Sequence, residues 1–83
     1  MLTEQNAISA ITILEDGQLQ IRRSRRVYDG ATMLSEQYHR HVLEPGQSLA
    51  QEDARVRAVA RALWTPEVIQ AFTQARAAVR NPS

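Results

Sequence analysis

Two histidines, His39 and His41, have the spacing in this chain that most resembles a metal site. If their segment is a β-strand, both side chains point to the same side, as in a His-x-His metal pair. Glu15 could reach the pair in space, but no third ligand lies nearby in the sequence. We therefore expect no bound metal, and we interpret the histidines as solvated or partner-contacting side chains.

The run Arg22-Arg23-Ser24-Arg25-Arg26 is the second group that could carry a function. Arginines on a strand can enter the DNA major groove, where they read guanine and contact phosphate. Because side chains alternate along a strand, however, only Arg22 and Arg26 share one face of the sheet, and the cationic stripe is thin. The simpler interpretation is that arginine stems cover the sheet edges while their charged heads remain in water.

Nothing in the sequence has the spacing of a catalytic site. The chain has no glycine-rich phosphate loop, no supported Ser-His-Asp arrangement and no cysteine. Its acids lie mainly in turns and at helix ends, where burial is not expected to tune their pKa values. We expect no enzyme, no catalytic residue and no cofactor.

Composition limits the classes of partner. The chain has 83 residues, and its ten basic residues, all arginine, are nearly cancelled by nine acids, which leaves a net charge of +1. That balance argues against a protein that depends on a large cationic field. No apolar run approaches the ~18 residues that cross a bilayer, so we expect no membrane partner. A core of this size supplies only roughly 3–5 kcal/mol, which makes help from a partner chain plausible.

Three strand-like segments, at about 7–14, 19–28 and 32–43, are separated by Asp16-Gly17 and Asp29-Gly30. Asp-Gly between apolar runs is a strong hairpin signal. The pattern therefore predicts a three-stranded antiparallel meander centred on residues 19–28. The polar residues 1–6 show no period and are expected to form a flexible tail.

Two short helices are expected after the sheet, at about 51–64 and 66–79, in a single α+β domain of order βββαα over residues 7–80. Ser48 with Gln51 could cap the first helix, and Asn81-Pro82 is expected to stop the second. Trp64, at the junction, is interpreted as a plug between helices and sheet.

If both Asp-Gly turns are two-residue loops, the faces of the sheet follow from the period of two. The face covered by the helices then contains Ile8, Leu14, Leu19, Ile21, Val27, Leu34, Tyr38 and Val42. The open face contains the residues that we expect to bind a partner, which are Ile11, Ile13, Arg22, Arg26, Gln37, His39 and His41. An ordinary wet sheet face is the alternative, and a bulge or a longer second turn would exchange the faces beyond it.

Several short motifs resemble a group of small, uncharacterised tailed-phage and prophage proteins that are encoded among virion genes. They are Ile11-Thr12-Ile13-Leu14-Glu15-Asp16-Gly17, Tyr38-His39-Arg40-His41-Val42-Leu43 with Pro45-Gly46, Glu52-Asp53, and Trp64-Thr65-Pro66-Glu67-Val68-Ile69. The relatives have Ser-Gly where this chain has Ala50-Gln51, which leaves the first helix cap open. The resemblance implies a phage setting near the tail, in the virion or the host cytoplasm, and no catalytic residue.

We therefore expect a non-enzymatic virion or accessory protein that binds protein partners or self-assembles through the open sheet face or a strand edge. The alternatives are a small DNA-binding regulator, which would use the arginine-bearing sheet, and an inhibitor of a host defence protein.

Overall fold

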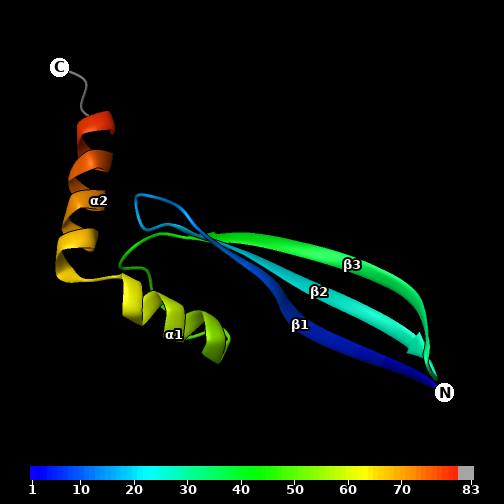
Figure 1. Cartoon of the computed structure of the whole chain (residues 1–83). Coiled ribbons are helices and arrows are strands. Elements are labelled where there is room, and N and C mark those ends of the chain that lie inside the picture. Colours follow the sequence, from blue (N-terminus) through cyan, green and yellow to red (C-terminus); the bar gives the residue numbers. More distant parts are fainter. Residues whose placement is uncertain (81–83) are drawn as a thin grey trace.

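The structure is a computed structural model that describes residues 1–80, with side chains as far as Ala78 (Figure 1). The expected helix stop at Asn81-Pro82 and the side chain of Val79 lie outside the described residues. The predicted α+β fold of order βββαα is confirmed, with one antiparallel sheet in the order β1-β2-β3. Its elements are β1 (Leu2–Ile13), β2 (Leu19–Asp29), β3 (Thr32–Leu43), α1 (Ala54–Leu63) and α2 (Pro66–Arg80).

Strand β1 begins at Leu2, ahead of the expected start near residue 7. The residues expected to form a flexible tail are instead paired with the far end of β2, where Leu2 lies opposite Asp29. Two ion pairs accompany this pairing. Arg25 Nε lies 2.7 Å from Glu4 Oε1, and the terminal amine lies 3.1 Å from Asp29 Oδ1. The second half of β2 thus supplies backbone and charged partners for residues 2–6, although these residues show no apolar period.

The first reversal is a three-residue loop and not the expected two-residue turn. Leu14 N donates to Gln18 O at 2.9 Å, so residues 15–17 form the loop, and Gly17 has φ +97°. Glycine is the residue that takes such a φ in three-residue hairpins. The extra residue shifts the register by one, so that Ile13 lies opposite Leu19 and Ile11 lies opposite Ile21. Ile11 and Ile13 therefore lie on the helix-covered face, not on the open face as predicted.

The second reversal and a bulge beside it place the residues of β3 on the opposite faces from those predicted. Asp29 pairs with Thr32 around a Gly30-Ala31 loop, and the register then slips by one residue between Val27 and Tyr28. A slip of one residue exchanges the two faces of everything beyond it. Tyr38 and the other β3 residues predicted to be covered, Leu34 and Val42, are 45%, 57% and 49% exposed respectively.

The core lies at the end of the sheet where β2 begins and β3 ends. Leu19, Ile21 and Leu43 of the sheet pack with Val56 and Ala60 of α1, and all five are buried. Val59, Leu63 and Trp64 flank them, so Trp64 packs between the helices and the sheet as predicted.

One hydrogen bond ties the helices to this end, and a side-chain cap sets where α1 begins. Trp64 Nε1 donates to Gly17 O at 2.7 Å and so ties the helix junction to the first loop. Helix α1 starts later than predicted, because Asp53 is its N-cap, with Oδ1 accepting from Arg55 N at 2.8 Å. Ser48 lies upstream, where its Oγ accepts from Ala50 N at 3.4 Å.

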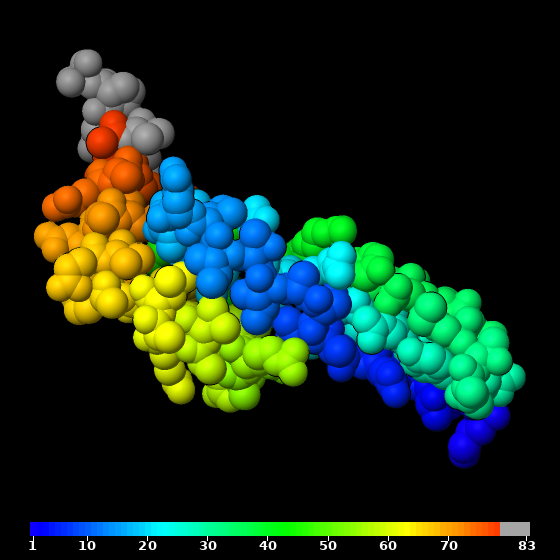
Figure 2. Space-filling model, in the orientation of Figure 1, coloured from blue at the N-terminus to red at the C-terminus, as the bar shows by residue number. Residues whose placement is uncertain are grey.

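The molecule is long and narrow, with extents of 59 × 26 × 20 Å and a radius of gyration of 16.9 Å. A compact chain of 83 residues would have a radius of gyration of about 12 Å. Both described helices lie at one end, and the sheet continues from there as a thin strip (Figures 1 and 2). We call that strip, residues 2–7, 24–29 and 32–37, the distal ribbon.

A candidate protein-binding face on the sheet

The face of the sheet opposite the helices is the candidate site, and we call it the open face. Strands β2 and β3 build its centre, because directly paired residues of an antiparallel sheet share a face. The paired residues are Gln20 with Val42, Arg22 with Arg40, Ser24 with Tyr38, and Arg26 with Glu36.

Two arginines bracket the ring of Tyr38 on this face. The guanidinium carbon of Arg22 lies 4.7 Å from the ring centroid, and that of Arg40 lies 5.7 Å from it. Each contact is within cation–π range and is worth about 0.5–1 kcal/mol at an exposed site. Arg22 is held further by Ser9, whose Oγ accepts from Arg22 Nε at 2.9 Å and donates to Arg22 O at 3.1 Å. The open face therefore has a positioned aromatic ring at its centre.

Glu36 supplies the negative charge on this face. Its Oε2 accepts from Arg26 Nε at 2.6 Å, and its Oε1 accepts from the Tyr38 hydroxyl at 2.8 Å. These hydrogen bonds, that of Arg26 first and that of Tyr38 second, hold the pKa of the Glu36 carboxyl below its usual value of 4.5. The same pair raises the pKa of Arg26. Glu36 is therefore ionised at neutral pH, and its two carboxylate oxygens each accept a hydrogen bond from a different neighbour.

Ser24 lies opposite Tyr38 and is fully buried, although it is on the side away from the helices. Its Oγ has no hydrogen-bond partner within the described part of the chain. An unpaired hydroxyl in such a place costs about 1–3 kcal/mol relative to a paired one. The packing around Tyr38 is thus tight enough to exclude solvent at the middle of β2.

The structure divides the predicted partner-binding residues between the two faces. Arg22 and Arg26 lie on the open face, as predicted, and Ile11 packs against the core. The others lie on the helix-covered side of the sheet, because they pair with residues of that side. These are Ile13, Gln37, His39 and His41.

His39 and His41 share a side of β3, as predicted, but that side is the one the helices partly cover. His41 Nε2 lies 2.8 Å from Glu52 Oε1. Within residues 1–80, no group of three or more His, Asp or Glu side chains is placed to hold a metal ion. The contact between His41 and Glu52 therefore links β3 to the segment before α1.

Sequence reasoning missed two members of the open face, Tyr38 and Arg40, because it placed the even-numbered residues of β3 under the helices. A signal for them was present. The alternating residues Leu34, Glu36, Tyr38, Arg40 and Val42 read as an amphipathic row with an aromatic centre. Only the position of the bulge decides which way that row faces.

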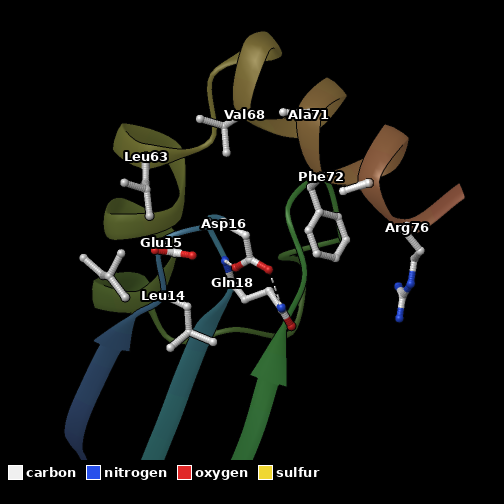
Figure 3. Close-up of a pocket in the computed structure, with 12 residues that line it drawn as sticks. Leu14, Glu15, Asp16, Gln18, Leu63, Val68, Ala71, Phe72 and Arg76 are labelled. Carbon is white, nitrogen blue, oxygen red and sulfur yellow. Dashed lines mark hydrogen bonds between the residues drawn. The ribbon is translucent and has the colours of Figure 1, made fainter. Parts of the chain in front are cut away.

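A groove lies between α2 and the first loop, away from the open face (Figure 3). It is an open groove of about 950 Å³. Leu14 and Gln18 line it from the loop side, and Val68 and Phe72 line it from α2. The groove is largely apolar, and Arg76, which lies at its rim, is ion-paired with Glu44.

Comparison with family models, curated proteins and solved structures finds no match to this chain. Among the described residues, neither helix combines the length and apolar character that a membrane span requires.

Proposed function

We propose that this chain is a non-enzymatic phage or prophage virion or accessory protein. It works by binding copies of itself or another protein through the open face or a strand edge of the sheet. The phage setting, and a place near the tail, rest on the motifs described under Sequence analysis. The binding role rests on the shape of the molecule.

The observation that carries the proposal is the distal ribbon. Both described helices lie at the other end, so neither packs on it, and three of its apolar side chains are exposed: Leu2 by 66%, Met33 by 51% and Leu34 by 57%. Sheets of few strands gain independent stability by packing a hydrophobic face on another element. A partner that covers the distal ribbon supplies that missing layer, and long open edges favour addition of another strand.

The test is the mass of the chain in solution, measured by light scattering across a concentration series, together with backbone hydrogen exchange. We expect a mass above that of the monomer and slow exchange along the distal ribbon. The substitution L34E, which places a charge on the ribbon, should lower the mass. A58E, which places the same charge on an exposed position of α1, should leave it unchanged.

A monomeric mass at all concentrations, with fast exchange in residues 24–37, would remove self-assembly from the proposal. Binding to another protein would then remain, to be tested with proteins encoded by neighbouring genes.

One observation favours DNA as a second candidate partner. Arg40 joins Arg22 and Arg26 on the open face, so the cationic stripe is wider than the sequence predicted. Fluorescence anisotropy with duplex DNA at two salt concentrations separates the candidates, because phosphate contacts make affinity fall steeply with salt. Salt-sensitive binding that R22A and R40A abolish would favour the DNA regulator.

A further inference from the structure

The outer edge of β3 carries a row of side chains that is complementary to itself. From Leu34 to Val42, the even-numbered residues read apolar, acidic, tyrosine, basic, apolar. Reversing the strand about Tyr38 reproduces that order with the charges exchanged. Every residue of β3 except Glu36 and Leu43 is exposed, and β3 is an edge strand, so the row is open to a neighbour.

We propose that two copies of this chain join edge to edge through β3, antiparallel, with Tyr38 on the two-fold axis. The inference rests on the proposed function and names the partner and the register. Tyr38 of one copy lies opposite Tyr38 of the other, Glu36 lies opposite Arg40, and Leu34 lies opposite Val42. The result is a continuous six-stranded sheet in the order β1-β2-β3-β3-β2-β1.

Charge is the first argument for this register. Within the described side chains, Arg40 has no carboxylate partner, and its guanidinium lies over the ring of Tyr38. Glu36 has two filled contacts, yet a carboxylate offers about four acceptor positions. Directly opposed residues of an antiparallel pair bring their Cβ atoms to about 4.5–5.5 Å, so Arg40 can reach Glu36 of the other copy. Symmetry makes this contact twice in each dimer.

Apolar pairing is the second argument. Leu34 and Val42 are 57% and 49% exposed in one copy, and the register places each against the other. The same register keeps like charges apart, since Arg40 of one copy lies about four residues, or roughly 13 Å, along the strand from Arg40 of the other. A register shifted by two residues in either direction loses both opposed Glu36–Arg40 pairs.

The comparison of the two edges is the third argument. The other edge strand, β1, is interrupted by a bulge at Ser9, between Ile8 and Ala10. Bulges bend an edge and disrupt the pairing of a further strand. In β3 the only register shift lies at Leu34, and the strand pairs regularly with β2 from Ser35 to Leu43. This regular stretch carries Glu36, Tyr38, Arg40 and Val42, and the bulged Leu34 lies at its end.

A charge-swap mixture tests the register. In R40E homodimers two carboxylates face each other at each pair, and in E36R homodimers two guanidiniums do, so each variant should dimerise about tenfold or more weakly than the natural chain. Mixed one to one, R40E and E36R should form a heterodimer, because every opposed pair is again acid against base. Sedimentation velocity with one variant fluorescently labelled measures both results, and circular dichroism checks that each variant is folded.

A disulfide trap tests the axis independently, because the natural chain has no cysteine. The variant Y38C should form a disulfide-linked dimer under mild oxidation, since the residue 38 thiols of the two copies face each other across the two-fold axis. T3C, on the β1 edge, is the matched control and should stay reduced.

The outcomes separate the register from the broader proposal. A dimer that survives R40E, or that is trapped by T3C and not by Y38C, overturns pairing through β3 while self-assembly stands. A natural chain that remains monomeric at every concentration overturns the inference and self-assembly together.

Discussion

At the scale of single residues, two ion pairs hold the distal ribbon from its two faces. Arg26 with Glu36 lies on the open face, and Arg25 with Glu4 lies on the other. In both, hydrogen bonds to the guanidinium are the largest cause of a lowered carboxyl pKa. The two pairs therefore serve as controls for each other.

We predict that R26Q raises the pKa of Glu36 towards 4.5 and leaves that of Glu4 unchanged, and that R25Q does the reverse. Because the folded pKa lies below the unfolded value, the stabilisation is present above pH 4.5 and is lost as the pH falls through the lowered pKa. Carboxyl titration followed by NMR measures both values. An unchanged Glu36 pKa in R26Q would show that Arg26 does not hold it.

At the scale of elements, the joint between the first hairpin loop and α2 depends on Gly17. A Cβ added there would lie 2.7 Å from Val68 Cγ1 and 3.1 Å from Pro45 Cγ. Gly30, in the second loop, also has positive φ, but a Cβ there would meet no atom within 4 Å. The two glycines share a backbone requirement and differ in their surroundings.

We predict that G30A destabilises the fold by about 1–2 kcal/mol, the cost of a left-handed backbone for alanine, and that G17A adds about 1–3 kcal/mol for overpacking. Urea unfolding followed by the fluorescence of Trp64 measures the difference, because Trp64 donates to Gly17 O. Equal losses in the two variants would mean that α2 does not pack against the loop in solution.

The order of elements was predictable from the sequence, because each strand, turn and helix has a local signal. The register was not, because it depends on single insertions. A three-residue loop at residues 15–17 moved Ile11 and Ile13 to the covered face, and one unpaired residue, Leu34, moved the rest of β3. Leu19 and Ile21 were placed correctly because the faces were counted from β2. The candidate site was predictable only where it lay on that strand, at Arg22 and Arg26.

At the scale of the whole molecule, the elongated shape is itself testable. We predict that the R40E variant, studied as a monomer by small-angle X-ray scattering, has a radius of gyration near 16.9 Å, since the distal ribbon extends away from the helices. A value near 12 Å, that of a compact chain of this length, would show that the ribbon folds back.

In the proposed dimer, the bulge at Ser9 of β1 would limit further growth at the outer edges of the sheet. If β1 were regular throughout, the β1 edge of one molecule could pair with the β3 edge of the next, and such an unclosed contact would build endless fibres. With β1 interrupted by its bulge and β3 already paired with a second copy, the proposed assembly would stop at a closed dimer. One extra residue in β1 would thus separate a closed dimer from an open fibre.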